Sequence, residues 1–188
     1  MLGWFIKVMS YINSAPHIHI ADSFVTHPEM LFALLRDKVE WDERLRARKT
    51  ASFGVSYDYS GMIYPQVEML AELLPICEQI YEELHFYPNN CLLNYYQDGL
   101  SSMGFHSDSS EELSEGTGVA IVSLGAERRI VFRSKLDSSI KFSFHLKNGA
   151  LLYMPKQIQS DWLHAIPKAP GVGERISLTF RSIVKSHT

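Results

Sequence analysis

Cysteine is scarce in this sequence of 188 residues, which contains only Cys77 and Cys91. These two lack the C-x-x-C spacing of a metal or redox motif, and the chain has no recognisable secretory signal. A disulfide framework and a structural zinc site are therefore not supported. We expect a reducing, cytoplasmic setting, in which thiols stay free.

A long apolar run is also missing. The start of the chain, Met1 to Met9, is apolar but is interrupted by Lys7 and soon gives way to polar residues. It is too short to span a bilayer. We expect a frayed or packed leader and no interaction with a membrane.

Positive charge is not in excess either. The net charge is −3, from 18 basic and 21 acidic residues, and the pI is near 6.2. This balance excludes a general attraction to a phosphate backbone and argues against a tight duplex binder. A local basic group remains, which either contacts phosphates or is a solvated loop: Arg44, Arg46, Arg48 and Lys49.

Repeats, linkers and low-complexity tracts do not divide the chain. Apolar residues make up 46% and charged residues 21%, which is typical of a globular protein. The length is sufficient to bury a core without disulfides. We predict a single domain over residues 1–188 that folds unaided as a monomer.

Two helices are predicted in the first half of the chain. Thr26 to Glu29 form a capping box that starts a helix of three to four turns, and a second helix begins near Pro75. Each carries apolar residues at helical spacing, which predicts one buried face: Met30, Leu31, Leu34, Leu35 and Val39 in the first, and Ile76, Ile80, Tyr81 and Leu84 in the second.

From Asn89 onward the pattern predicts strands almost throughout. Short apolar or alternating runs are separated by Gly, Asp and Ser turns: Cys91–Tyr96, Met103–Asp108, Val119–Leu124, Arg129–Arg133, Ile140–Leu146, Ala150–Met154, a run around His164, and Arg175–Arg181. Eight short strands at this spacing suit a jelly roll. We therefore predict a mainly β fold with flanking helices, in the α+β class.

The tripeptide His106-Ser107-Asp108 suggests a metal site. Side chains two residues apart on an extended segment point to the same side, so both can contact one ion. His164, in an apolar and aromatic context, is the candidate for a third ligand. Two histidines and one carboxylate form the facial set of non-haem Fe(II) oxygenases, which leaves coordination positions open.

A second pattern points to an anionic ligand. Arg175, Ser177, Thr179 and Arg181 share one face of an alternating strand. An isolated H-x-D is commonly an ordinary hydrogen-bonded pair in a loop. Followed by a strand-borne histidine and two arginines on one strand face, it favours the catalytic interpretation.

The segment from Ala47 to Tyr64 is rich in aromatic residues and glycine. Tyr57 and Tyr59 project to the same side if this segment is extended. Such a pair beside basic residues suits the stacking of a planar ring. The alternative is a plain hairpin whose tyrosines cover the edge of the core.

These residues resemble the AlkB-like Fe(II)/2-oxoglutarate-dependent dioxygenases over roughly residues 48–184. The motifs that carry the resemblance are Asn94-Tyr95-Tyr96, His106-Ser107-Asp108, Ser123-Leu124-Gly125, Gly149–Met154, Trp162-Leu163-His164 and Arg175–Arg181. The resemblance implies a double-stranded β-helix (jelly-roll) core at residues 89–184. N-terminal helices and a substrate lid would precede it at residues 1–88.

The resemblance also implies two ligand sets and a reaction that consumes O2. Fe(II) would be held by His106, Asp108 and His164. The co-substrate 2-oxoglutarate would be held by Asn94, Tyr96, Arg175 and Arg181. Arginine suits this task because it offers a bidentate fork to a carboxylate and stays charged.

The substrate implied by the resemblance is an N-alkylated base in DNA or RNA. Tyr59 would stack on one face of a flipped-out base while His106 bounds the other. The residues expected to contact substrate are Arg48, Lys49, Tyr57, Tyr59 and Ser110. Ser110 lies where some repair members carry an acidic residue after the metal aspartate. Because of this difference, the resemblance does not decide the identity of the substrate.

Two alternative functions remain at this point. The first is a 2-oxoglutarate-dependent hydroxylase of a small molecule such as an amino acid or metabolite. The second is a non-enzymatic β-barrel module that uses the metal ligands structurally. The paired arginines argue against the second alternative, because a structural metal site needs no clamp for a co-substrate.

Overall fold

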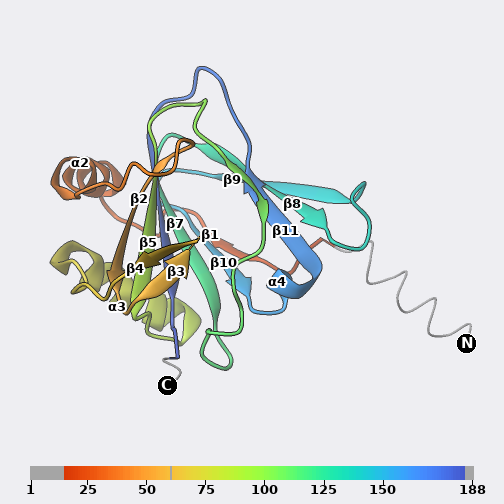
Figure 1. Cartoon of the computed structure of the whole chain (residues 1–188), viewed down its shortest axis with the longest axis horizontal. Helices are drawn as coiled ribbons and strands as arrows, with labels where there is room; N and C mark the ends of the chain where they lie inside the picture. Colours follow the sequence, from red (N-terminus) through yellow and green to blue (C-terminus); the bar gives the residue numbers. More distant parts are fainter. Residues whose placement is uncertain (1–14, 60, 185–188) are drawn as a thin grey trace, which may run out of the picture.

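The computed structural model describes residues 15–59 and 61–184, and the predicted leader Met1 to Met9 lies outside them. Two antiparallel sheets face each other (Figure 1). The larger has the order β1-β10-β7-β12-β5-β2: His19–Ala21, Leu151–Pro155, Gly118–Gly125, Arg175–Arg181, Asn90–Tyr96 and Lys49–Gly54. The smaller has the order β6-β11-β8-β9: Met103–His106, Trp162–Ile166, Arg128–Ser134 and Lys141–Leu146. The predicted mainly β, jelly-roll fold is confirmed.

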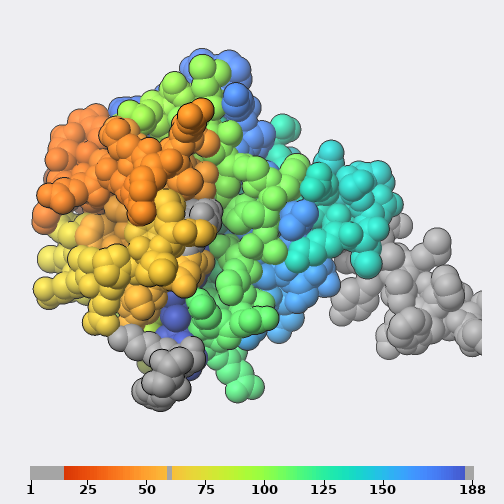
Figure 2. All heavy atoms as spheres, viewed as in Figure 1, coloured from red at the N-terminus to blue at the C-terminus, as the bar shows by residue number. Residues whose placement is uncertain are grey.

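The segment expected to form the lid contains a separate hairpin. It consists of β3 (Tyr57–Tyr59) and β4 (Met62–Tyr64), which pair antiparallel. In Figure 2 the orange and yellow atoms of this region meet the green atoms of the segment around β6 on the face in view. The two strands β1 and β2, which also come from the first 88 residues, extend the larger sheet by pairing with β10 and β5.

The larger sheet is covered on both faces. One face packs on α2 (Pro28–Lys38) and α3 (Leu74–Leu84), and the other packs on the smaller sheet (Figure 1). Strands β5, β7 and β12 are therefore buried at nearly every position. The sequences of β5 and β7 are largely apolar, whereas β12 alternates polar and apolar residues. Strands β8 and β9 alternate in exposure because the outer face of the smaller sheet meets solvent.

The helix predictions need two corrections. First, α2 begins at Pro28 with no hydrogen bond from a capping side chain, and Glu29 Oε1 instead accepts from Asn148 Nδ2 at 2.9 Å. The capping box was therefore wrong. Second, only a narrow stripe of each helix contacts the sheet, so three residues predicted to face inward are exposed: Met30, Leu34 and Tyr81.

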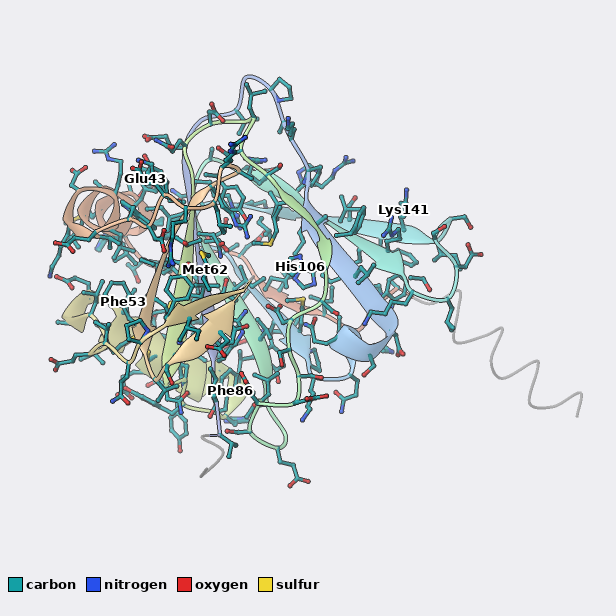
Figure 3. The ribbon with its side chains drawn as sticks, viewed as in Figure 1. Glu43, Phe53, Met62, Phe86, His106 and Lys141 are labelled. Atoms are coloured by element: carbon teal, nitrogen blue, oxygen red, sulfur yellow. The ribbon has the colours of Figure 1, made fainter. Side chains whose placement is uncertain are left out.

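Another short helix, α4 (Ile158–Asp161), connects β10 to β11. In Figure 3 the His106 side chain lies between the two sheets, whereas Lys141 lies toward the far end of the smaller sheet. No helix within residues 15–59 and 61–184 combines the length and the apolar character needed to cross a bilayer.

Candidate active site

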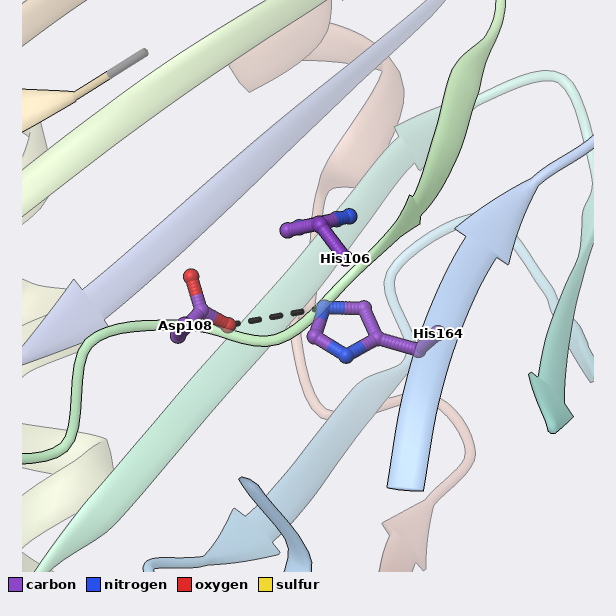
Figure 4. Close-up of side chains that lie close together, drawn as sticks. All are labelled: His106, Asp108 and His164. Atoms are coloured by element: carbon purple, nitrogen blue, oxygen red, sulfur yellow. Dashed lines mark ion pairs between the residues drawn. The ribbon is translucent and has the colours of Figure 1, made fainter. Parts of the chain in front are cut away.

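The smaller sheet brings the three predicted metal ligands together. His106 ends β6 and is paired in register with His164 of β11, and Asp108 follows two residues after His106 (Figure 4). One candidate ligand atom from each residue lies within 4.8 Å of the other two. The two imidazole rings are 4.3 Å apart between centroids. This spacing fits a single ion bound by all three side chains.

Each of the two histidines has a ring nitrogen available to an ion in the cluster. His106 Nδ1 lies 3.0 Å from the carbonyl oxygen of Gly104, so it carries the proton and leaves the Nε2 lone pair available. His164 Nε2 lies 3.4 Å from Asp108 Oδ2, and its buried Nδ1 has no hydrogen-bond partner among the described residues. The nitrogen of His164 that faces Asp108 is Nε2, so an ion bound by the cluster would contact this atom (Figure 4).

The electrostatics of the cluster favour an ionised Asp108 and a neutral His164. Burial alone would raise the pKa of Asp108, but Arg181, whose Nη2 donates to Asp108 Oδ1 at 2.6 Å, and the two histidines outweigh it and lower that pKa to about 2. Burial lowers the pKa of His164 to about 4, against the opposing effect of Asp108. Both groups are therefore in the form that a metal requires near neutral pH.

One cavity contains all seven residues predicted to bind metal or co-substrate. Its lining combines polar and apolar groups: Leu92, Asn94, Tyr96, Met103, His106, Asp108, Ile121, Ile130, Leu146, His164, Ile166, Arg175, Ser177, Thr179 and Arg181. The face predicted for the alternating strand, from Arg175 to Arg181, is therefore the face that borders this cavity. The metal cluster comes from the smaller sheet and the segment after β6, whereas the predicted co-substrate residues come from β5 and β12 of the larger sheet.

Arg175 is a buried cation, and two of its hydrogen-bond donors have no partner among the described residues. It is fully buried, and its Nε donates to Ser123 Oγ at 2.8 Å. Nη1 and Nη2 have no hydrogen-bond partner among the described residues, and the guanidinium lies 5.2 Å from the centre of the Tyr96 ring. Burial lowers its pKa to about 10, so it remains charged at neutral pH. Two unpaired donors on a buried cation call for an anion such as a carboxylate.

The predicted basic contact residues are engaged within the protein. Arg48 is buried, and its Nε donates to Asn94 Oδ1 at 2.8 Å. Lys49 Nζ lies 2.6 Å from Glu43 Oε1. Arg44 forms an ion pair with Asp42. Arg48 therefore supports the cavity wall in this structure, because its head group turns toward Asn94 rather than toward solvent.

The predicted aromatic platform is only partly described. Tyr57 is buried, with the Arg181 guanidinium 4.6 Å from the centre of its ring. It packs against Arg181, which bonds to Asp108, instead of presenting an open face. Tyr59 ends β3, and its side chain lies outside the described part of the structure. Ser110 is half-buried in the loop after Asp108, where its carbonyl accepts from Leu113 N.

Sequence reasoning missed two residues that support the site. Arg128 is buried beside Tyr96, with its guanidinium 5.5 Å from the ring centre, and Gln159 accepts a hydrogen bond from Asp108 N. The alternation of Arg128 with inward-facing Ile130 could have shown that Arg128 points inward. Gln159 lies in a helix of four residues, which has no periodicity to reveal it.

Comparisons with known proteins place the chain among oxygenases. The model of the 2OG-Fe(II) oxygenase superfamily matches residues 4–181. "DNA oxidative demethylase ALKBH2" of Mus musculus is 33% identical over 153 residues, which cover 73% of this chain and 62% of that protein. "Alpha-ketoglutarate-dependent dioxygenase alkB homolog 3" of Rattus norvegicus is 30% identical over 165 residues, which cover 77% of this chain and 56% of that protein. This chain thus spans 53–62% of the length of its mammalian ALKBH2 relatives.

Two further similarities cover nearly the whole chain. "Uncharacterized protein R406" of Acanthamoeba polyphaga mimivirus is 26% identical over 182 residues, which cover 94% of each protein. The solved structure described as "The structure of OsALKBH1" aligns with a TM-score of 0.64 and 15% identity, covering 90% of this chain and 99% of that chain. At this identity the structural match shows the fold alone.

Proposed function

We propose that this chain, which belongs to the 2OG-Fe(II) oxygenase superfamily and is AlkB-like, removes alkyl groups from the nitrogen atoms of nucleobases in DNA or RNA by oxidation. The observation that carries the proposal is the single cavity shared by a His-Asp-His cluster and a buried arginine with two unpaired donors. The relatives named as a DNA oxidative demethylase and as a dioxygenase support the reaction.

In this proposal His106, Asp108 and His164 hold Fe(II). When bound, the iron supplies an O2-dependent oxidation of a C–H bond, coupled to the conversion of 2-oxoglutarate to succinate and CO2. The protein keeps Asp108 ionised through Arg181 and keeps His164 neutral through burial. Oxidation of an N-methyl group gives a hydroxymethyl group, which leaves as formaldehyde and restores the base.

The co-substrate 2-oxoglutarate would occupy the part of the cavity between the metal ligands and Arg175. Arg175 offers Nη1 and Nη2 to the distal carboxylate, in the bidentate geometry that a guanidinium favours. Tyr96 and Asn94 border the same space, and Arg181 lies at the metal end through its bond to Asp108. The apolar lining excludes water and strengthens these charge interactions.

The flipped-out base would approach from the side of the β3–β4 hairpin. Tyr59 is proposed to stack on it, with Ser110 near its edge and Lys49 near the backbone of the nucleic acid. Arg48 and Tyr57 are assigned a supporting role, because they contact Asn94 and Arg181. We further propose that the chain acts as one domain and as a monomer in a reducing compartment such as the cytoplasm.

A second candidate is hydroxylation of a small molecule by the same core. It is favoured by the ion pairs that neutralise two basic residues of the predicted phosphate contact, Arg44 with Asp42 and Lys49 with Glu43. The net charge of −3 points the same way.

A substrate screen that follows succinate distinguishes the two candidates. Purified protein with Fe(II) and 2-oxoglutarate is given either N-methylated oligonucleotides or a library of amino acids and metabolites. We expect the methylated oligonucleotides, and not their unmethylated controls, to raise succinate formation and to release formaldehyde. Stimulation by a metabolite with no response to any oligonucleotide would overturn the demethylase proposal and leave the oxygenase assignment intact.

Binding to methylated oligonucleotides tests the proposed lid. Fluorescence anisotropy should show an affinity that decreases with salt, and Tyr59→Ala should weaken binding by about 1–3 kcal/mol through lost stacking. Uncoupled consumption of 2-oxoglutarate should be unchanged, since Tyr59 belongs to neither proposed ligand set. A salt-independent or absent signal in the unaltered protein would argue for a small-molecule substrate.

A further inference from the structure

Asp108 lies outside the strand ladder that positions His106. Strand β6 ends at His106, so the backbone of Asp108 has no strand partner to fix it. Its amide N–H donates instead to the side-chain oxygen Oε1 of Gln159, at 2.9 Å. Both residues are buried, with 9% and 3% of their surfaces exposed. The main chain that presents the carboxylate is thus held by a residue 51 positions further along the sequence.

The same glutamine anchors the residue before Asp108 through a lysine. Lys135 Nζ donates to the backbone carbonyl of Gln159 at 2.7 Å and to Ser107 Oγ at 3.2 Å. Two consecutive residues of the segment after β6 are therefore connected to one point on α4. Gln159 Nε2 contacts Met154 Sδ at 3.8 Å, a weak hydrogen bond that limits rotation of the amide.

We infer that Gln159, assisted by Lys135, is a positioning residue that sets the place of Asp108 in the metal site. This inference rests on the proposed function, because it concerns the metal site on which that function depends. Arg181 donates to the carboxylate at 2.6 Å, and Gln159 accepts from the main-chain amide at 2.9 Å. Partners that orient a metal ligand in this way commonly change metal affinity by about 10–100-fold when they are lost.

A role in packing alone would not require this residue type. An amide buried to this degree is unfavourable unless its polar atoms are bonded, and methionine would fill a similar volume without that cost. Replacing Gln159 by methionine removes the acceptor and leaves the Asp108 N–H without a partner in a buried place. The segment would then relax toward another acceptor and carry the carboxylate with it.

The test measures metal binding by the full chain, using Mn(II) alone and the electron paramagnetic resonance signal of the free ion. Gln159→Met should weaken Mn(II) binding by about 10–100-fold. The matched control is Gln157→Met, because Gln157 is exposed two residues away at the start of the same helix. The control should bind Mn(II) as the unaltered chain does. Equal affinity of Gln159→Met and the unaltered chain would overturn the inference.

A second variant keeps the test decisive if Gln159→Met does not fold, as judged by circular dichroism. Lys135 is exposed, so Lys135→Met should fold, and it should weaken Mn(II) binding severalfold by freeing Ser107. Unchanged affinity in Lys135→Met would then overturn the inference. His164→Ala separates this result from failure of the proposed function. If the unaltered chain binds Mn(II) no better than His164→Ala, the metal site itself is wrong.

Discussion

At the scale of single residues, Arg175 makes the clearest prediction, because it has two hydrogen-bond donors without a partner among the described residues and lines the cavity. Arg175→Lys keeps the charge but cannot form two parallel hydrogen bonds to one carboxylate. With charge-assisted bonds contributing about 1.5–3 kcal/mol, we expect 2-oxoglutarate to bind about 10–100-fold more weakly. Isothermal titration with 2-oxoglutarate in the presence of Mn(II) measures this directly.

Arg129→Lys is the matched control for Arg175→Lys. Arg129 also lies in a strand, but its side chain is exposed on the outer face of the smaller sheet. The control should leave the affinity for 2-oxoglutarate unchanged. If Arg175→Lys behaves like the control, another residue binds the distal carboxylate.

The two cysteines provide a prediction about pH. Burial, with the nearby charge of Glu78, raises the pKa of Cys77 to about 12, and burial also raises the pKa of Cys91. The thiolate is the reactive form, so at pH 9 both thiols should react slowly with iodoacetamide in the folded protein and rapidly in urea. Because the unfolded chain releases these protons near pH 8.5 and the folded chain does not, stability should fall as the pH rises above that value.

Mass spectrometry of the alkylated protein checks the reactivity of the thiols, and urea unfolding checks the dependence of stability on pH. The unfolding midpoint in urea, measured between pH 8 and pH 10, should decrease. Alkylation of either cysteine at the same rate with and without urea would contradict the burial on which the prediction depends.

At the scale of elements, Arg128 joins two loops at one end of the barrel. Its guanidinium donates to the carbonyl oxygens of Asp98, Ser101 and Pro167, at 3.3, 2.8 and 2.7 Å. These residues belong to the connections from β5 to β6 and from β11 to β12. Arg128 thereby fixes the strands that carry His106 and Arg175 relative to each other.

Arg128→Met should lower the free energy of unfolding by about 2–4 kcal/mol, because three partly buried carbonyl groups lose a charged donor. Urea denaturation gives this value. Arg129→Met is the control, since the next side chain along β8 is exposed and should change stability by less than about 0.5 kcal/mol. A similar loss in both variants would show that the loops do not depend on Arg128.

The strands and the positions of α2 and α3 were predictable from sequence, whereas the contacts at the start of α2 were not. The buried strands β5 and β7 are largely apolar runs, and β12 alternates polar and apolar residues. Those patterns are local, so the sequence contains them. The start of α2 is different, because Glu29 bonds to Asn148, a residue 119 positions away that no local pattern connects to it.

The residues of the site also fall into those that local sequence predicts and those that it does not. His106, Asp108 and Arg175 could be identified because spacing and side-chain type specify their chemistry. Arg48 was expected at the surface because arginine usually is, whereas it is buried by its bond to Asn94 on the neighbouring strand. Gln159 could not be predicted, since its importance arises only when the chain folds α4 against the segment after β6.

At the scale of the whole molecule, metal should stabilise the fold measurably. A metal that binds only the folded state adds about 2.7 kcal/mol to the free energy of unfolding at a concentration 100 times its dissociation constant. Thermal unfolding in Mn(II) should therefore occur at a higher temperature than in EDTA. His164→Ala should lose this difference, and an equal increase in that variant would place the bound metal elsewhere.

The two sheets hold different halves of the proposed chemistry. The metal cluster belongs to the smaller sheet and its following segment, and Asn94, Tyr96, Arg175 and Arg181 belong to the larger. A dicarboxylate that contacts both the metal cluster and these four residues would link the two sheets. Separation of the sheets would then require loss of the bound co-substrate. The co-substrate should therefore slow amide hydrogen exchange in the strands of both sheets, including positions that do not contact it.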